Sequence, residues 1–332
     1  MANDKAIWVV AQLEDGKLLN VTLELLGKAK ELAAKAGTTA DVVLLAATDD
    51  GLSAKCIACG ADTVYTVLGP ELAEYDTEIY TNALCELIGE YHPGTVMFGA
   101  TIDGRDLAPR VAARLGTGLC ADCTALDIEE TGLVKWTRPA MGGNLYGTIV
   151  CAEHRPQMGS IRPKVFEPLA EDPSRKGDIV AYTVKNPVTS PMTVLKKEPL
   201  STGGKRKIED ADVVVCGGRG MGDAEQFRAL EDLADLFEKG AVAGTRAAVD
   251  EKWVDHASQV GQSGKTIKPD VYFAFGVSGA MQHTSGMKDS GLVIAVNKDE
   301  NAPIFEFSHI GVVGDARKIL PLLTAKLKEL KK

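Results

Sequence analysis

The feature that most constrains the fold is a regular alternation of short apolar runs with longer segments of helical periodicity. Residues 41–47 (DVVLLAA) form a continuous apolar run, which is typical of a strand buried on both faces. Similar runs occupy 6–11, 63–68 and 95–100, and segments whose apolar residues have helical spacing separate them. This βαβα order predicts a parallel, doubly wound sheet and therefore an α/β fold.

Local signals place the helices between these strands. Asn20 is expected to cap a helix that stops at Gly37, because glycine readily adopts the left-handed conformation that ends a helix. A second helix is expected over 76–90 and a third over 106–115. Pro109 lies in the third, and proline fits a helix only within its first turn.

Beyond Gly118 the pattern changes to shorter, β-rich segments separated by proline and glycine. A proline-containing stretch over 187–199 leads into 201–207 (STGGKRK), which is typical of a linker. We therefore expect two domains. An N-terminal αβ domain with a β-rich segment, serving as a scaffold or subunit interface, spans 1–204, and a C-terminal domain spans 205–332.

The C-terminal part repeats the alternation of strands and helices. Residues 212–216 (DVVVC) predict a strand, 217–222 (GGRGMG) a glycine-rich turn and 224–239 an amphipathic helix. Asp315 is expected to cap a final helix. Further strands are expected over 241–244, 271–276 and 292–296.

The composition argues against several classes of function. Lys and Arg total 37 against 46 Asp and Glu, a net charge of -9, so nucleic acid and anionic membranes are set aside as partners. No stretch approaches the roughly 18 apolar residues of a membrane span, and the N-terminus lacks a secretory pattern. We therefore expect a cytoplasmic protein without membrane insertion. Seven scattered cysteines suit reduced thiols better than disulfides.

A phosphate site is the first candidate for function. The turn at 217–222 stands between a strand and a helix, where backbone N–H groups can bind phosphate and Arg219 can add a guanidinium. The turn is not a complete G-x-G-x-x-G, and tight strand–helix turns need glycine for steric reasons as well. The turn alone leaves both interpretations open.

Four polar loops strengthen the phosphate interpretation. They are 245–246 (TR), 259–265 (QVGQSGK), 277–283 (VSGAMQH) and 297–299 (NKD), and each lies next to a predicted strand. The carboxyl ends of parallel strands share one edge of a sheet, so these loops should converge on one crevice. Hydroxyls, amides, arginines and bare backbone turns suit a phosphate-bearing dinucleotide.

Other motifs carry less weight. No Ser-His-Asp or Cys-His set is visible, and His283 taken alone is more often structural than catalytic, so no catalytic residue is assigned. The two C-x-x-C pairs, at 56–59 and 120–123, are too far apart for a zinc ribbon. Buried or incidental thiols are favoured there over a metal site. The Arg-Pro segments at 138–144 and 162–166 are interpreted as rigid turns or part of a partner surface.

Six segments of the C-terminal part carry the signature of a known family. Together they resemble the α subunit of electron transfer flavoproteins, and the resemblance spans essentially the whole chain. It implies a Rossmann-like, parallel-sheet C-terminal domain that binds FAD. The segments are VVCGGRG (214–220), GTRAAVD (244–250), QVGQSGK (259–265), YFAFGVSGAMQH (272–283), GMKDS (286–290) and IAVNKD (294–299).

The resemblance implies roles for individual residues around FAD. Arg219 would lie by the flavin or pyrophosphate, Arg246 against the isoalloxazine ring, Ser263 at flavin N5 and His283 near O2. Arg246 and His283 in those places would favour an anionic flavin semiquinone electrostatically. The other implied cofactor-binding residues are Thr245, Gln259, Val260, Gly261, Gln262, Gly276, Ser278, Gly279, Ala280, Met281 and Gln282, with Asn297 and Asp315 at the adenosine half.

The resemblance also implies partners. The family forms heterodimers with a β subunit and shuttles single electrons between a dehydrogenase and an acceptor. Acyl-CoA dehydrogenases of fatty acid β-oxidation, such as butyryl-CoA dehydrogenase, are typical partners. Electron-bifurcating members oxidise NADH at the β subunit and send one electron to ferredoxin or flavodoxin while an enoyl-CoA is reduced. The residues do not separate the two forms, and either would act in the bacterial cytoplasm.

Two alternatives remain on the residues alone. An NAD-dependent oxidoreductase could use the same crevice, with His283 as its one candidate proton donor. Its glycine-rich turn, however, lacks a clear ribose-binding acid about 20 residues further on. A non-catalytic scaffold is the second alternative, because the N-terminal αβ domain shows no glycine-rich phosphate loop.

Overall fold

The computed structural model describes residues 5–140, 145–196 and 206–331, which divide into two compact units. The first unit is Met1–Leu195 and the second is Lys196–Lys332, and each is described by itself. The predicted junction between 204 and 205 lies outside the described residues, as does the end of the Arg-Pro segment at 138–144.

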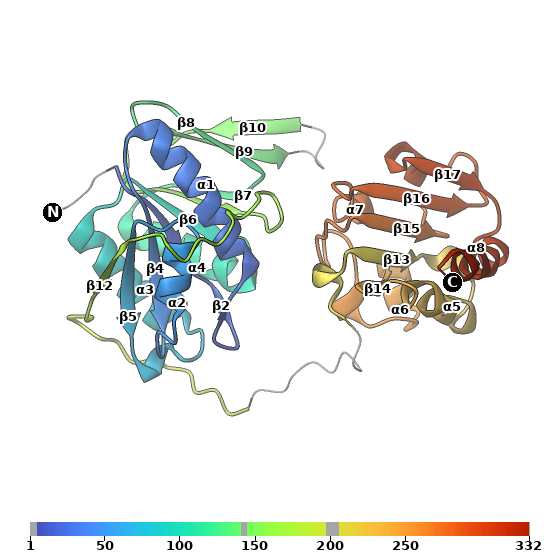
Figure 1. Ribbon diagram of the computed structural model, residues 1–332, viewed down its shortest axis with the longest axis horizontal. Helices are drawn as coiled ribbons and strands as arrows, with labels where there is room; N and C mark the ends of the chain where they lie inside the picture. The colour runs from blue at the N-terminus through green and yellow to red at the C-terminus, as the bar shows by residue number, and fades with distance from the viewer. Residues whose placement is uncertain (1–4, 141–144, 197–205, 332) are drawn as a thin grey trace. The chain divides into compact units, whose positions relative to one another are not determined.

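A seven-stranded parallel sheet forms the centre of the N-terminal unit (Figure 1). The first strand, β1, has later strands added on both of its sides, as a doubly wound sheet requires. The strands, in spatial order, are β12 (Asp178–Ala181), β5 (Thr63–Leu68), β4 (Ala40–Ala46), β1 (Ile7–Val10), β6 (Thr95–Gly99), β11 (Gln157–Ile161) and β7 (Leu119–Cys123).

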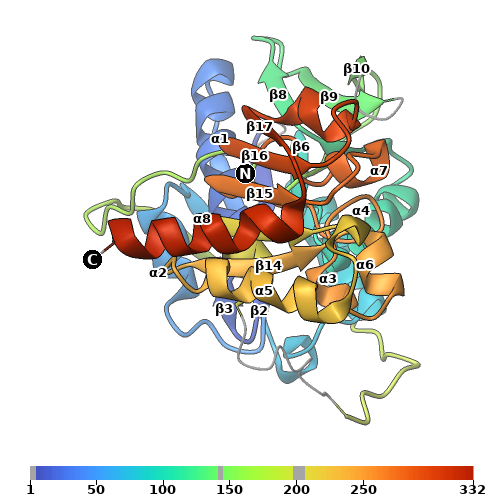
Figure 2. The same cartoon turned by 90° about the vertical axis from the view of Figure 1, so that its right-hand side faces the viewer.

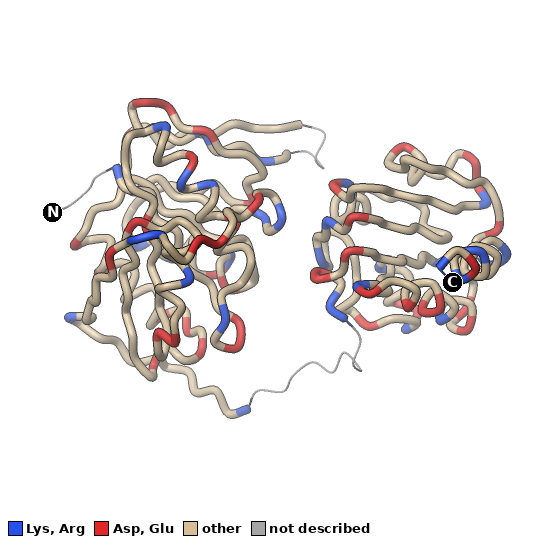
Figure 3. The backbone as a smooth tube through the Cα atoms, viewed as in Figure 1, with Lys and Arg blue, Asp and Glu red and all other residues tan. Residues whose placement is uncertain are grey.

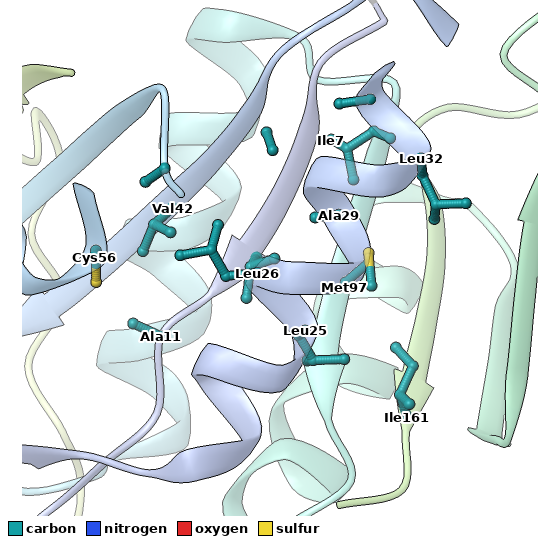
Figure 4. Close-up of a cluster of buried hydrophobic side chains, with 14 of the residues drawn as sticks. Ile7, Ala11, Leu25, Leu26, Ala29, Leu32, Val42, Cys56, Met97 and Ile161 are labelled. Carbon is teal, nitrogen blue, oxygen red and sulfur yellow. The ribbon is translucent and has the colours of Figure 1, made fainter. Parts of the chain in front are cut away.

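Helices cover both faces of this sheet and bury two apolar clusters. Helices α1 (Asn20–Ala36) and α2 (Leu52–Ala58) contribute to one cluster, and α3 (Thr77–Tyr91) and α4 (Ile102–Leu115) to the other. Figure 4 shows the first cluster, where Leu26 and Ala29 of α1 lie with strand side chains such as Val42. The strand over 40–46 is buried at every position, which explains the unbroken apolar run over 42–46 that follows Asp41.

The β-rich segment divides between two structures. Part of it forms a three-stranded antiparallel sheet of β8 (Ala125–Ile128), β9 (Val134–Ala140) and β10 (Leu145–Ile149). Its other strands, β7, β11 and β12, join the large parallel sheet instead. Gly159 of β11 makes room for the Trp136 ring, because a Cβ there would lie 2.2 Å from a ring carbon. A two-stranded hairpin, β2 (Leu13–Glu14) and β3 (Lys17–Leu18), completes the unit.

Two local predictions in the N-terminal unit are wrong. Asn20 is the first residue of α1 rather than its cap; Leu19 holds the cap position and supplies no side-chain hydrogen bond. Helix α4 begins at Ile102 rather than at 106, because the Thr101 hydroxyl accepts from the Gly104 N–H and starts the helix earlier. Pro109 therefore lies inside the helix and not in its first turn.

The C-terminal unit is a five-stranded parallel sheet with helices and loops on its faces. Phe227 of α5 and Leu320 of α8 pack on one face of it, where Figure 2 shows both helices. The predicted helix over 224–239 ends at Ala234. In spatial order the strands are β14 (Gly240–Gly244), β13 (Val213–Gly217), β15 (Val271–Phe275), β16 (Leu292–Asn297) and β17 (Ile310–Val313). The helices are α5 (Ala224–Ala234), α6 (Arg246–Asp250), α7 (Met281–Thr284) and α8 (Ala316–Leu330).

Short 3₁₀ turns connect several of these elements, and two of them matter for the site described below. One, η4 (Arg219–Met221), lies in the glycine-rich turn after β13, and another, η6 (Pro303–Phe307), packs beside the loop after β15. The others within the described residues are η1 (Pro70–Leu72), η3 (Ile208–Asp210) and η5 (His256–Ser258).

Candidate functional site

The strand order of the C-terminal sheet points to one edge as the binding site. The chain runs from β13 to β14 on one side and then returns to β15 on the other, so the order reverses between β13 and β15. In doubly wound sheets ligands bind in the crevice at the carboxyl ends of the strands, where this reversal occurs. The loops that follow β13 and β15 are 217–222 and 276–280.

These two loops touch through their backbones. The Gly218 N–H donates to the Phe275 carbonyl at 2.9 Å, and the Gly220 N–H donates to the Gly276 carbonyl at 3.0 Å. A Cβ at Gly220 would lie 2.7 Å from the Gly276 oxygen, so no larger residue fits there. The steric interpretation of the glycine-rich turn is therefore part of the explanation of its glycines.

The same loops also border a cavity of about 180 Å³. Three cationic side chains line it. Gly220, Gly222 and Gly276 line it with backbone alone, so their peptide groups are not covered by side chains. This combination suits a diphosphate, because cations and exposed peptide groups both stabilise phosphate oxygens. The lining residues are Arg219, Gly220, Gly222, Gly276, Asn297, Lys298, Asp315, Ala316 and Arg317.

The cations around the cavity differ in how they are held. Asp315 accepts from Arg317 at 3.0 Å (Nε) and 2.7 Å (Nη2), and it also caps α8 through the Arg317 N–H. These bonds lower the pKa of Asp315 to about 2. Arg219 has no ion-pair partner within 5–140, 145–196 and 206–331, so its guanidinium is available to an anion. Basic and acidic residues are mixed over the rest of the unit (Figure 3).

Asn297 holds the loop after β15 in place. Its Nδ2 donates to the Val277 carbonyl at 2.8 Å, and its Oδ1 accepts from the Asp299 N–H at 3.0 Å. Its side chain therefore shapes one wall of the cavity. Gly279, with a φ of +88°, lets that loop pass close to Ile304 of η6, whose N–H donates to the Ser278 carbonyl. Ser278 and Ala280 lie exposed beside it.

A second group of predicted residues packs together next to this loop. The Gln262 N–H donates to the Gln282 carbonyl at 2.8 Å, and the Gln259 side chain donates to Ser263 Oγ at 2.9 Å. Gly261 has a φ of +136°, and a Cβ on it would lie 2.5 Å from the Gln282 oxygen. The loop over 259–263 and helix α7, which starts at Met281, therefore form one continuous wall.

The loop after β14 joins the same wall. The Thr245 N–H donates to the Gly217 carbonyl at 3.1 Å, and the Val260 N–H donates to the Gly244 carbonyl at 3.0 Å. The Thr245 hydroxyl caps the short helix α6. The side chain of Arg246 is 72% exposed, and its ion pair with Asp250 is long, at 3.8 Å, so it can turn toward a ligand.

His283, like the predicted residues Gln259 and Val260, is buried within the protein. Its Nε2 lies 2.9 Å from the Tyr272 hydroxyl and its Nδ1 3.1 Å from the Val260 carbonyl. Burial lowers the pKa of His283 to about 4, so the ring is neutral near pH 7. A buried, neutral ring with both nitrogens engaged is poorly suited to proton transfer, which weakens the dehydrogenase alternative that needs it as a donor.

Sequence reasoning missed several residues of this edge. Both Lys298 and Arg317 line the cavity, but Lys298 was predicted only as part of the polar loop over 297–299 and Arg317 was not predicted, although each lies within two residues of Asn297 or Asp315. A cation next to a helix start or strand end was the available signal. Tyr272 was missed because it reads as one more apolar position in its strand; only the contact with His283 identifies it.

The cysteines form no second candidate centre in the part of the chain that the structure describes. All seven cysteines are free, and both C-x-x-C pairs are buried. Burial raises the pKa of the Cys56 thiol to about 12, which makes it unreactive. Among the described residues, no three His, Cys, Asp or Glu side chains are grouped so that they could hold a metal ion. Nor does any helix in that part of the chain have the length and apolar character to cross a membrane.

Comparison with known proteins identifies related chains over almost the full length. The electron transfer flavoprotein domain matches residues 7–187, and the electron transfer flavoprotein FAD-binding domain matches residues 207–288. The chain is 44% identical over 334 residues to the electron transfer flavoprotein subunit alpha of Thermoanaerobacterium thermosaccharolyticum, covering 100% of both chains. It is 45% identical to the same subunit of Clostridium acetobutylicum, covering 98% of each. It is 40% identical to the acryloyl-CoA reductase electron transfer subunit beta of Anaerotignum propionicum, covering 97% of this chain and 95% of that one.

Proposed function

This chain belongs to the electron transfer flavoprotein family as an FAD-binding alpha subunit, and we propose that it carries single electrons between a dehydrogenase and an acceptor. The observation that carries the proposal is the edge of the C-terminal sheet. There a cation-lined cavity and a wall of small, polar loop residues lie side by side without an acid–base pair. A site that binds a flavin and moves no proton on a substrate suits a carrier.

The residues present fit FAD in two parts. Arg219, Lys298 and Arg317, with the bare backbone of the glycine loops, would hold the diphosphate. The wall made by 259–263 and α7 would hold the flavin ring. We assign the cofactor-binding residues implied by the resemblance to these two parts, with Asn297 and Asp315, implied at the adenosine half, lining the cavity beside the diphosphate.

FAD supplies the chemistry of accepting and releasing electrons one at a time. The chain's contribution is to hold the ring and to balance the negative charge that a first electron adds, which favours the anionic one-electron state. Arg246 is suited to this because its guanidinium is exposed, weakly paired and next to the wall. The Ser263 hydroxyl, which accepts from Gln259, is left with its own hydrogen to donate to the flavin.

We propose that the chain works as a heterodimer with a β subunit. Support comes from the relatives, which are named as alpha or electron transfer subunits of larger assemblies. An acyl-CoA dehydrogenase, such as a butyryl-CoA dehydrogenase, is the proposed electron partner. One relative serves an acryloyl-CoA reductase, and acryloyl-CoA is an enoyl-CoA. Bifurcation, with NADH at the β subunit and ferredoxin or flavodoxin as second acceptor, is the extended form of this proposal.

Two further assignments accompany it. The proposed location is the bacterial cytoplasm, which fits relatives from bacteria. The proposed domain organisation remains 1–204 for the scaffold and subunit interface and 205–332 for FAD binding. The two matched family domains leave residues 188–206 between them, which is compatible with that division.

The test is a stepwise reductive titration of the protein co-purified with its binding subunit, followed by visible absorbance and flavin content. One FAD per heterodimer that accumulates in its anionic one-electron state supports the simple carrier. Two FADs, of which one passes directly to the two-electron state, support bifurcation. Protein that binds no flavin and oxidises a substrate with NAD would overturn both and restore the dehydrogenase alternative.

A further inference from the structure

His283 is held at both ring nitrogens by atoms of this chain. A carbonyl oxygen can only accept, so the 3.1 Å contact with Val260 places the hydrogen on Nδ1. The neutral ring then presents a lone pair at Nε2, and the Tyr272 hydroxyl, 2.9 Å away, donates to it. The tautomer therefore follows from the two partners, and no N–H of the ring remains for a ligand.

Tyr272 is well placed to stay a donor. It is fully buried on β15, in the apolar cluster that also contains Cys216 of the neighbouring strand β13. Burial raises the pKa of Tyr272 well above its usual value and that of Cys216 to about 12. Besides His283, Cys216 is a titratable neighbour of the Tyr272 hydroxyl, and neither Tyr272 nor Cys216 ionises near neutral pH.

The ring connects the sheet to the wall of the candidate FAD site. His283 belongs to α7, Val260 to the loop over 259–263, and Tyr272 to the central strand β15. The Gln262 N–H to Gln282 carbonyl bond joins the same loop and helix at 2.8 Å. Without the Tyr272 hydroxyl, the ring would lose this hydrogen bond to the sheet.

We propose that Tyr272 is a positioning residue, whose hydroxyl fixes His283 as the neutral Nδ1–H tautomer and thereby holds the 259–263 loop against α7. This role rests on the proposed function only where it concerns FAD. It separates two residues that the family resemblance groups together. Arg246 supplies the positive charge toward the reduced flavin, whereas the neutral His283 fixes the position of the 259–263 loop relative to α7.

The decisive measurement is the tautomer of His283 in the full-length holoprotein. Proteins labelled with ¹⁵N-histidine are compared by two-bond N–H correlation spectra between pH 6 and 8, and the His283→Gln variant assigns the resonances among the five histidines. We expect the neutral Nδ1–H pattern in the wild type, unchanged across this range. A ring protonated at both nitrogens at pH 7, or the Nε2–H tautomer, would overturn the proposal without any variant.

The second measurement uses Tyr272→Phe, which removes only the hydroxyl. We expect the His283 Nε2 resonance to shift toward that of a lone pair without a hydrogen-bond donor and to titrate at higher pH than in the wild type. The FAD dissociation constant should rise about fivefold, the loss of one ordinary hydrogen bond. An Nε2 resonance unchanged by the substitution would refute the role of Tyr272.

Tyr80→Phe is the matched control, because it removes one partly buried hydroxyl bond, to the Leu72 carbonyl at 2.9 Å, in the other unit. It should leave the His283 resonances and the FAD affinity unchanged. The spectra report on the tautomer whether or not FAD carries electrons. A protein that binds no FAD but shows the expected tautomer would therefore refute the proposed function while supporting the role of Tyr272.

Discussion

Gly220 and Gly276 meet backbone to backbone at the edge of the C-terminal sheet, where the Gly220 N–H donates to the Gly276 carbonyl at 3.0 Å. Gly276 has a φ of +61°, and a Cβ on it would lie 2.7 Å from the Gly220 carbonyl carbon. The two loops that border the cavity therefore leave no room for a side chain at their contact. This contact sets the separation of the loops and so the shape of the cavity between them.

Gly220→Ala is expected to open this contact. The new Cβ would lie 2.7 Å from the Gly276 oxygen and 2.8 Å from its Cα, so one loop must move. We expect a loss of about 2 kcal/mol in the free energy of unfolding of the C-terminal unit and a clear loss of bound FAD. Denaturant unfolding and flavin content measure the two effects.

Gly89→Ala is its control. Gly89 lies in α3, and a Cβ there has nothing within 4 Å. This substitution should be neutral or stabilise the protein by about 0.5–1 kcal/mol, since alanine is the better helix former. Equal losses of FAD in the two variants would show that the Gly220–Gly276 contact has no special part in binding.

Arg246→Ala is expected to disfavour the first one-electron reduction of the bound FAD. The side chain is 72% exposed, so solvent screens part of its effect, and we expect a threefold to tenfold change. That corresponds to a fall of about 30–60 mV in the first potential. Spectroelectrochemical titration measures it. As a control, Arg228→Ala removes an exposed arginine from α5 and should leave the first reduction potential unchanged. A first potential unaltered in Arg246→Ala would contradict the assigned role.

Arg317→Ala should weaken the binding of FAD through its diphosphate. The Arg317 guanidinium lines the cavity, held there by two bonds to Asp315, and a charge-assisted bond to phosphate is worth about 1.5 kcal/mol or more. We expect roughly a tenfold rise in the FAD dissociation constant by equilibrium dialysis. Lys318→Ala, one residue further and outside the cavity lining, is the matched control. Equal losses in the two variants would mean that only net charge matters.

The shifted pKa of Asp41 is expected to make the stability of the N-terminal unit depend on pH. Burial raises the pKa of this carboxyl from 3.8 to about 6, so folding disfavours the carboxylate. The free-energy cost of burying the charged carboxylate is absent below pH 3.8, grows as the pH rises to about 6 and is constant above it. Asp41→Asn removes the charge, and we expect it to be more stable than the wild type by up to roughly 3 kcal/mol at pH 8.

The measurement is denaturant unfolding of both proteins at pH 4, 6 and 8. The difference between them should be small at pH 4 and largest at pH 8. Asp127→Asn is the control, since its exposed carboxylate accepts from the Ile128 N–H and pairs with Lys35, and both interactions lower its pKa. That substitution should bring no gain at pH 8. A stability difference for Asp41→Asn that does not vary with pH would rule out burial of the charge as its cause.

Much of the fold could be predicted because its signals are local. The run over 41–47 indicated a strand buried on both faces, Gly37 ended the first helix in the left-handed conformation, and Asp315 caps the last helix as expected. Each of these depends on a few consecutive residues. Thr101 shows the limit: its capping bond started α4 four residues before the predicted position and placed Pro109 inside the helix.

The candidate site could be predicted as a set of loops, because the carboxyl ends of parallel strands share an edge. The contacts between particular loops could not be predicted. Strand β17 was missed, and with it the full strand order that locates the reversal between β13 and β15. Arg317 and Lys298 join the cavity only because strands distant in the sequence are neighbours in that order.

The sequence by itself determined the α/β class, the glycine-rich turn and the family, since periodicity, capping and motifs are properties of neighbouring residues. Only the tertiary structure decided that β11, from the β-rich segment, lies between β6 and β7, and that Tyr272 and Val260 leave His283 neutral and without a free N–H. The physical reason is that strand order, burial and hydrogen-bond partners depend on residues far apart in the chain. The free energy that these long-range contacts contribute therefore depends on the folded arrangement and is not contained in any short stretch of sequence.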